Sequence, residues 1–592
     1  MKQLKPQDAQ FLFMEDANLA SHITGISIYD QSTAPGGIVR FKDILNLAEE
    51  RLHDSPIYSQ KLMRLPLDMD FPYWVEDKFF EIENHVSHRR LPQPADWRQF
   101  CIQVARLHSK PMDMTRPPWE FHVIEGLNNI DDIPEGAFAI VMKMHHAAFD
   151  GTSALRFMSS IADLGPTGPA LFPPAPNKIK TQTSTSPAKL VRRAAASNAS
   201  SPVKFARSAL KYAPALARES AMRAMGQIEK STPAVKTRFN GEISPNRAFD
   251  SVTFDLNEFK RIAKTFGEAK VNDIVLAVVA GGLREYLGSK NELPDIPLKI
   301  SAPVNLRAKD AKASDSDGNN ISTIVLPIFT NIKNPVDRLN AIVSASQAAK
   351  ASKSGVISRL AMEAIQHVPA PAISVLGPLL VRAEVGGDLA ANAVVSNVAG
   401  PPIPLYVCGA EMIRSMAMAP IGSGLGLFIA TPSYNGQISF SITTTRQIMP
   451  DTPYFMDCLR RAVQELSEAT DKKLGIDGVP GQPRKTYHRT RAKGTSALKP
   501  KQTEQTAEAA VIEAPVPAAP RTKSRRKAAA PSPKKAPARK AAAETAKPAT
   551  TRSPKSGSKS KTTARKSSGR KAASSTKQAG APRKRAAKSK AP

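Results

Sequence analysis

The chain has 592 residues, more than a single domain usually contains, and it therefore has room for at least two domains with cores of their own. Its formal net charge is +31, but residues 481–592 hold 31 basic and 4 acidic residues, which leaves the preceding body a net charge of only +4. The strong basicity therefore does not indicate a nucleic-acid-binding fold, and any inference about polyanions concerns the C-terminal segment alone.

Cysteine usage and apolar runs exclude further classes of protein. Cys101, Cys408 and Cys458 lie far apart and form no CxxC pair, which argues against a disulfide framework and a cysteine-built zinc site. No run reaches the ~18 apolar residues of a membrane span, and the N-terminus lacks the apolar run of a signal peptide. We therefore expect a cytoplasmic protein, either soluble or peripheral at a membrane.

Composition divides the chain into four regions. Residues 1–170 and 231–475 mix apolar, aromatic and charged residues, as globular domains do, whereas residues 171–230 are rich in Ala, Ser, Pro and basic residues. Residues 476–592 are rich in Lys, Ala, Pro and Ser and cannot bury enough apolar area to offset the entropy of folding, so we predict a disordered tail. Both globular regions alternate strand and helix patterns, which predicts an α/β fold class.

The predicted elements of the first globular region surround a short polar motif. Residues 137–144 form an unbroken apolar run that predicts a buried strand, and residues 152–162 predict a helix. The motif lies between these two elements, at the end of the strand.

In the second globular region, strands are predicted over residues 298–304, 321–329, 425–431 and 437–443. The last two flank Asn435-Gly436, a dipeptide typical of a β-hairpin turn. Residues 451–473 predict a helix, with Asp451 at its N-cap and Gly475 beyond its end.

The motif after the first strand is His145-His146-Ala147-Ala148-Phe149-Asp150-Gly151. A strand end can point an imidazole into a cleft, and a neutral imidazole near pH 7 can take a proton from an alcohol or amine that attacks a carbonyl. Gly151 permits a backbone turn that a side chain would hinder. The residues alone leave two alternatives open: a metal site, which the single nearby acid and the absent cysteines disfavour, and a pair of hydrogen-bonded structural histidines.

The pattern HHxxxDG resembles the signature of the chloramphenicol-acetyltransferase-like superfamily, which includes coenzyme A-dependent acyltransferases and condensation domains of peptide synthesis. More closely, the chain resembles the bacterial wax ester synthase/acyl-CoA:diacylglycerol acyltransferase family over about residues 4–470. Further blocks that carry this resemblance are Gln7-Asp8-Ala9-Gln10-Phe11-Leu12, Pro72-Tyr73-Trp74-Val75-Glu76-Asp77, Arg116-Pro117-Pro118-Trp119-Glu120, Asn272-Asp273-Ile274, Pro303-Val304-Asn305-Leu306-Arg307, Gly318-Asn319 and Ser396-Asn397-Val398-Ala399-Gly400-Pro401. In the third block Pro118 stands where the family has Leu.

The resemblance implies two similar α/β domains that form a pseudodimer, with an active site in a central channel. His146 would deprotonate the acceptor hydroxyl, which then attacks the thioester of acyl-CoA, with His145 beside it. Asp150 would be structural, and Arg307 is its candidate partner in an ion pair. Acyl-CoA would be a substrate, and the resemblance implies no cofactor and no metal.

The remaining residues of these blocks are candidates for the substrate channel or for structure. Pro117 and Trp119 are expected in a packed turn that shapes the channel. Asn272 and Asp273 either cap the helix that follows them, which we favour because Asx side chains satisfy open amides there, or act in catalysis. Asn319 and Asn397 belong to the later blocks.

The basic segments suggest additional partners. In residues 171–230, apolar residues at helical spacing beside Lys and Arg suit either a helix on an anionic membrane surface or a helical linker with solvated charges. The tail resembles linker-histone ends in composition only, and its charge suits polyanions such as nucleic acid, polyphosphate or anionic lipid headgroups.

We therefore expect an acyl-CoA-dependent O-acyltransferase that esterifies diacylglycerol or a long-chain fatty alcohol to triacylglycerol or wax ester. It would lie at the inner face of the cell membrane and on lipid inclusions. Two alternatives are acyl transfer to another alcohol or amine, and a non-catalytic basic adaptor of lipid inclusions.

Overall fold

The computed structural model describes residues 2–53, 55, 57–149, 151–172, 186–225, 232–305, 321–351, 368–374 and 391–476. Asp150, Arg307 and Asn319 lie outside the described residues, as does the predicted tail beyond residue 476, so the proposed ion pair of Asp150 with Arg307 stays a prediction. In the part of the chain that the structure describes, no helix is both long and apolar enough to cross a bilayer.

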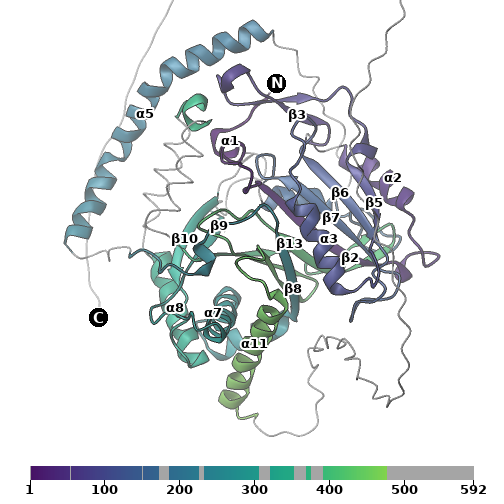
Figure 1. Ribbon diagram of the computed structural model, residues 1–592, viewed down its shortest axis with the longest axis vertical. Helices are drawn as coiled ribbons and strands as arrows, with labels where there is room; N and C mark the ends of the chain where they lie inside the picture. Colours follow the sequence, from purple (N-terminus) through teal and green to yellow (C-terminus); the bar gives the residue numbers. More distant parts are fainter. Residues whose placement is uncertain are drawn as a thin grey trace, which may run out of the picture. The chain divides into compact units, whose positions relative to one another are not determined.

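The first globular region is built around a six-stranded mixed sheet of order β12-β13-β2-β7-β6-β5 (Figure 1). The strands of this sheet are β2 (His22–Asp30), β5 (Val86–Arg90), β6 (Trp119–Glu125), β7 (Phe138–His145), β12 (Tyr406–Val407) and β13 (Ala410–Met418). The helices of this region are α1 (Pro6–Phe13), α2 (Phe41–Leu52), α3 (Trp97–Ser109) and α4 (Gly151–Ser159), and a three-stranded sheet joins β1 (Lys2–Gln3), β4 (Tyr73–Glu76) and β3 (Gln60–Met63). The apolar run at 137–144 is thus the central strand β7, as predicted.

Two strands of this first sheet come from the second globular region. β13 pairs antiparallel with β2 and runs from Glu411 opposite Asp30 to Met418 opposite Thr24. Without it, β2 would be an edge strand with unpaired backbone amides and carbonyls, which β13 satisfies. A division of the chain at residue 231 therefore does not describe the two sheets completely, because β12 and β13 belong to the sheet of the first region.

The second sheet has the order β10-β9-β11-β14-β15-β8, with β11 parallel to both β9 and β14. Its strands are β8 (Ala248–Asp255), β9 (Lys299–Asn305), β10 (Ile321–Pro327), β11 (Ala393–Ala399), β14 (Phe428–Tyr434) and β15 (Gln437–Thr444). Its helices are α6 (Leu256–Thr265), α7 (Val271–Ser289), α8 (Pro335–Ala351) and α11 (Thr452–Leu474), and α5 (Pro187–Ala224) precedes them. Two α/β regions, each with a six-stranded sheet, confirm the predicted fold class.

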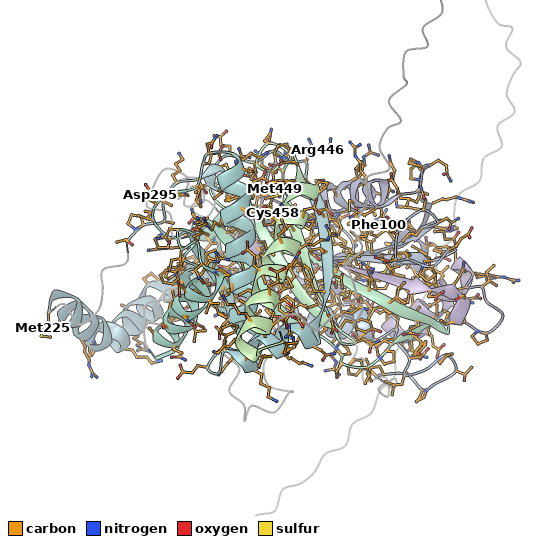
Figure 2. All side chains as sticks on the ribbon, turned by 90° about the horizontal axis from the view of Figure 1, so that it is seen from below. Phe100, Met225, Asp295, Arg446, Met449 and Cys458 are labelled. Carbon is orange, nitrogen blue, oxygen red and sulfur yellow. The ribbon has the colours of Figure 1, made fainter. Side chains whose placement is uncertain are left out.

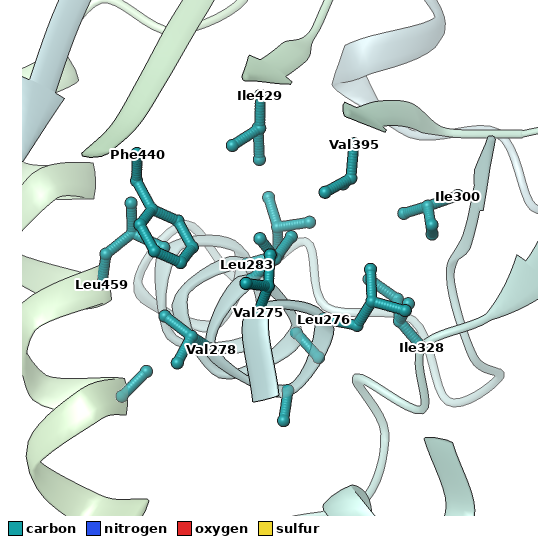
Figure 3. Packing of buried hydrophobic residues seen from close by; sticks show 14 of the residues in the cluster. Val275, Leu276, Val278, Leu283, Ile300, Ile328, Val395, Ile429, Phe440 and Leu459 are labelled. Carbon is teal, nitrogen blue, oxygen red and sulfur yellow. The ribbon is translucent and has the colours of Figure 1, made fainter. Parts of the chain in front are cut away.

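Helix α7 is the centre of the second core (Figure 3). Val275, Leu276, Val278 and Leu283 are each buried to 1% exposure or less, and they pack against apolar residues of the sheet and of α11. A helix that is apolar on all sides is stable only when it is enclosed. Burial of α7 against the sheet therefore holds its first turn, with Asn272 and Asp273, in a defined place.

The predicted hairpin is present, and both ends of α11 lie where they were predicted. Tyr434 pairs with Gln437, and the two turn residues Asn435 and Gly436 have φ angles of 43° and 76°, as a tight turn requires. Gly475 ends α11 in the left-handed conformation, with a φ of 67°.

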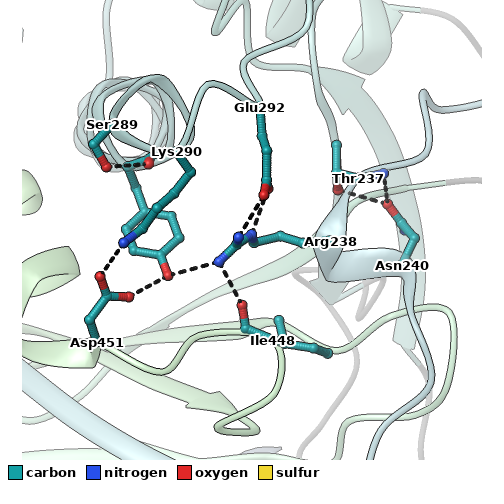
Figure 4. A network of polar contacts seen from close by, with 9 residues as sticks. Thr237, Arg238, Asn240, Ser289, Lys290, Glu292, Ile448 and Asp451 are labelled. Atoms are coloured by element: carbon teal, nitrogen blue, oxygen red, sulfur yellow. Dashed lines mark hydrogen bonds and ion pairs between the residues drawn. The ribbon is translucent and has the colours of Figure 1, made fainter.

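Asp451 is the N-cap residue of α11, as predicted, but its carboxylate makes no capping hydrogen bond. It accepts hydrogen bonds from the Tyr286 hydroxyl and the Lys290 ammonium, each at 2.6 Å (Figure 4). Arg238 extends this network, because it donates to the Tyr286 hydroxyl at 3.4 Å and to both carboxylate oxygens of Glu292 at 2.6 Å. Both hydrogen bonds to Asp451 are charge-assisted, because the acceptor is an ionised carboxylate.

Candidate active site

The histidine pair lies at the carboxyl end of β7, between its two neighbouring strands. The backbone amide of His145 donates to the Pro118 carbonyl at 3.1 Å, and that of His146 donates to the Ser21 carbonyl at 2.8 Å. Pro118 immediately precedes β6, and Ser21 immediately precedes β2. Backbone bonds on both sides therefore fix the position of the motif, as expected of a site on a rigid sheet.

The side chain of His145 is enclosed by the protein. Its side chain is 1% exposed, and its Nδ1 accepts the Ala147 amide at 3.1 Å. Since Nδ1 is an acceptor, the proton of a neutral His145 lies on Nε2, which is 3.1 Å from a carboxylate oxygen of Glu15. Glu15 also accepts the Ser21 amide at 2.7 Å and thus ties the start of β2 to the motif.

His146 has a different environment. The residue is half-buried, and its ring stacks on the ring of Phe11 with centroids 4.1 Å apart and planes 9° from parallel. Its Nδ1 is buried. Stacking against one face of the imidazole fixes the plane of the ring. Proton transfer takes place at the ring nitrogens on its edge, so the stack does not block it.

Apolar residues from both regions of the chain surround the motif. Leu4, Phe13 and Ala147 belong to one buried cluster, which also contains Ala370, a residue of the helical segment 370–374 that is 1% exposed. Exclusion of water by such walls strengthens electrostatic interactions at a reacting centre.

Two further histidines lie buried beneath the motif. His22 is the partner of His145 in the pairing of β2 with β7, and its Nε2 donates to the His108 carbonyl. Burial lowers the pKa of His22 to about 3, and it lowers the pKa of His108 well below the usual range. Both are therefore neutral at pH 7, because a protonated imidazole would lose its hydration there.

A buried lysine adjoins this group. Lys143 has a fully buried side chain, and its ammonium lies 3.8 Å from Glu120 and donates to the Lys110 carbonyl. Burial lowers its pKa to about 8. Burial alone would raise the pKa of Glu120, but the hydrogen bond from His122 and the charge of Lys143 outweigh it and lower that pKa to about 2.

Gly151 begins helix α4, which leads from the motif to an apolar cavity of about 50 Å³. Leu155 and Met158 of α4 line this cavity together with Val398 and Gly400, so it lies between elements of the two regions. A Cβ atom on Gly400 would lie 2.3 Å from the Ser433 carbonyl oxygen, which explains the glycine.

Trp119 lies in the core. It is fully buried, its indole N–H donates to the Tyr58 carbonyl at 2.9 Å, and its ring contacts five other aromatic residues. The carbonyl of Pro117 accepts the Trp119 amide at 2.9 Å in a turn before β6. This turn supports the segment that binds the His145 backbone.

Asn272 and Asn397 come together at 3.5 Å, although they are 125 positions apart. The hydrogen bond between these two side chains joins α7 to β11. It therefore belongs to the region of the second sheet, whereas the backbone hydrogen bonds of His145 and His146 belong to that of the first. Asp273 is the third residue of α7, and its carboxylate accepts the amide of Lys270, the N-cap residue, at 2.9 Å. Asp273 therefore stabilises the start of the helix from its first turn and not from the N-cap itself.

Within the residues that the structure describes, no group of three or more His, Cys, Asp or Glu side chains is arranged to hold a metal ion.

Comparison with models of protein families assigns the chain to a family. Residues 4–275 match the wax ester synthase/diacylglycerol acyltransferase catalytic domain, and residues 317–467 match the C-terminal domain of the same family. The chain belongs to the wax ester synthase/diacylglycerol acyltransferase family. It is therefore an acyltransferase, and the resemblance stated from its motifs is confirmed.

Individual relatives agree with this assignment. The O-acyltransferase WSD of Acinetobacter baylyi is 27% identical over 474 residues, which cover 78% of this chain and 96% of that protein. A Mycobacterium tuberculosis protein named probable diacylglycerol O-acyltransferase tgs2 is 29% identical over 483 residues, or 79% of this chain and 99% of the relative. The wax ester synthase/diacylglycerol acyltransferase structure from Marinobacter aquaeolei VT8 has a TM-score of 0.56 at 24% identity, covers 79% of this chain and 100% of that one, and has the same fold.

Sequence reasoning missed three residues beside the motif: Glu15, His22 and His108. None belongs to a motif with the histidine pair: Glu15 and His22 lie 130 and 123 positions before His145, and His108 lies 86 positions from His22. Phe11 lies in a block that carried the family resemblance, but no feature of that block indicated that its ring would stack on His146.

Proposed function

We propose that His146 is the general base of an acyl transfer from acyl-CoA to a hydroxyl group. The observation that carries the proposal is the difference between the two histidines. His145 is buried, with its ring nitrogens directed to Ala147 and Glu15, whereas His146 is half-buried and held by a stack against its face.

The reaction balances with this single base. His146 takes the proton of the acceptor hydroxyl as its oxygen attacks the thioester carbonyl carbon. The carbon–oxygen bond of the new ester forms, the carbon–sulfur bond breaks, and the proton passes from His146 to the departing thiolate of coenzyme A. Such general-base catalysis contributes roughly a hundredfold to ten-thousandfold in rate.

Within this proposal the acyl donor is a long-chain acyl-CoA, and the acceptor is diacylglycerol or a long-chain fatty alcohol. The family and the named relatives support these classes, because their names specify diacylglycerol acyltransferase or wax ester synthase activity. Acyl-CoA is a substrate in this scheme, and no cofactor is required. We also propose that the enzyme acts as a peripheral protein at the cytoplasmic face of the membrane and on lipid inclusions.

The test compares His146→Ala with His145→Ala. Purified protein is incubated with labelled palmitoyl-CoA and either diacylglycerol or hexadecanol, and the ester is quantified. We expect His146→Ala to lose at least a hundredfold in turnover with an unchanged unfolding transition. His145→Ala should lose less turnover but should lower stability, because it removes the buried contact with Glu15.

His88→Ala is the matched control, since the His88 side chain is 44% exposed and pairs with Glu125 on β5 and β6. It should leave turnover unchanged. A greater loss of turnover in His145→Ala than in His146→Ala, measured at a temperature at which both variants are folded, would contradict the assignment of the base.

A further inference from the structure

The first four turns of helix α5 contact the rest of the protein. Leu190 and Ala194 are buried against Tyr73 and Leu65, and the Asn198 side chain donates to the Met69 carbonyl at 2.8 Å. Ser201, one turn further on, is 7% exposed. Spacings of three and four residues place these positions on one face of the helix, which is the face that contacts the protein.

Beyond Ser201, the described side chains of α5 are exposed. The large apolar ones are Val203 at 55% and Leu210 at 73%, and Met225, just after the helix, is 64% exposed (Figure 2). At 3.6 residues per turn, Val203 and Leu210 lie roughly 140° and 160° around the helix from Leu190. The apolar stripe therefore points away from the face that holds the helix to the protein, opposite to the usual arrangement of a surface helix.

Basic residues border this stripe. Lys204, Arg207, Lys211 and Arg218 are exposed and occupy an arc of about 60°, which begins about 40° from Val203. The whole of α5 contains eight basic residues and one acidic residue. A solvated linker needs neither such a charge excess nor an ordered stripe, whereas an anionic lipid surface is complementary to both.

The helix is also better suited to an interface than to the bilayer interior. Pro202 and Pro214 lie inside α5, and each removes a backbone hydrogen bond, which leaves a carbonyl that water must satisfy. Leu67 is 91% exposed and lies between Leu65 and Met69, which both contact the start of α5. It adds a further exposed apolar group near the attachment point.

We propose that α5 lies on the surface of an anionic phospholipid bilayer, with Val203 and Leu210 inserted among the lipids and the neighbouring basic residues on the headgroups. This inference goes beyond the proposed acyl transfer and can fail without it. The inserted stripe would hold the enzyme at the surface where apolar substrates are dissolved.

The test uses the full chain and separates the contribution of the basic tail, whose net charge of +27 also suits anionic lipid. Leu210→Trp places a reporter in the stripe, and Ile296→Trp places the same reporter in the loop between α7 and β9, where Ile296 is 54% exposed. With vesicles of brominated phosphatidylglycerol and phosphatidylcholine, we expect quenching of the tryptophan at position 210 and none at position 296. Equal quenching at the two positions, or none at position 210, would refute the proposal.

Co-sedimentation at raised salt, which screens the tail, gives the second measurement. The double variant Val203→Ser with Leu210→Ser should bind these vesicles at least tenfold more weakly, whereas Ile296→Ser should bind normally. Lys204→Gln with Lys211→Gln should weaken binding at low salt to phosphatidylglycerol vesicles but not to pure phosphatidylcholine vesicles.

Acyl transfer to detergent-dispersed substrate should be unchanged in all these variants, so a failure of the docking proposal remains distinguishable from a failure of the catalytic one. Equal binding by the double serine variant and the wild-type chain would assign α5 the role of a solvated linker.

Discussion

His22 is buried beside the histidine pair, and its burial predicts that the protein loses stability in mild acid. Its Nε2 donates to the His108 carbonyl, while its Nδ1 is buried and has no hydrogen-bond partner among the described residues. Protonation of Nδ1 would therefore place an unpaired charge in the core. This is why burial lowers the pKa of His22 from 6.5 to about 3.

Proton linkage determines the direction and the size of the change in the free energy of unfolding with pH. As the pH falls below 6.5, the unfolded chain binds a proton at His22 and the folded chain does not, so stability is lost between pH 6.5 and about 3 and is fully present above 6.5. From pH 7 to pH 5 this single group costs about 2 kcal/mol. Any folded pKa below about 4 leads to nearly the same cost, because the unfolded pKa determines it in this range.

The assay is denaturant unfolding at pH 7 and pH 5, followed by tryptophan emission, in the wild type and in His22→Gln. The glutamine amide can still donate to the His108 carbonyl but does not titrate. We expect the variant to lose about 2 kcal/mol less than the wild type between the two pH values. His88→Gln, a substitution at a partly exposed histidine, controls for the loss of an imidazole. An identical pH dependence in His22→Gln and the wild type would refute the reasoning.

Two further predictions concern the motif and the tail. Glu15→Ala should destabilise the protein by about 1–3 kcal/mol, measured by the same unfolding assay, because it leaves the Ser21 amide without its acceptor and removes the carboxylate beside the His145 ring. Stability equal to that of the wild type would show that water replaces the carboxylate. Truncation after Pro480 removes a segment of net charge +27 and should abolish salt-sensitive co-sedimentation with DNA. Turnover on detergent-dispersed substrate should be unchanged. Loss of that turnover would show that the tail contributes to catalysis.

The sequence by itself determined the α/β class, the family and the position of the histidine pair. These features are local: an apolar run long enough to be β7, the HHxxxDG spacing after it, and the Asn435-Gly436 turn each depend on residues that are close together in the chain. The buried helix α7 and the end of α11 at Gly475 follow from local patterns for the same reason.

Only the tertiary structure decided which residues surround those histidines and which face of α5 is exposed. Glu15, Phe11 and His22 reach the motif from segments more than 100 positions away, and β13 completes the sheet of β7 from the other region of the chain. Such long-range contacts produce no pattern in the sequence. The strand or ring that makes each contact depends on which strand edge or space the rest of the fold leaves open. The difference between the two histidines, a buried His145 and a half-buried His146, arises from these long-range contacts and not from the motif that contains both.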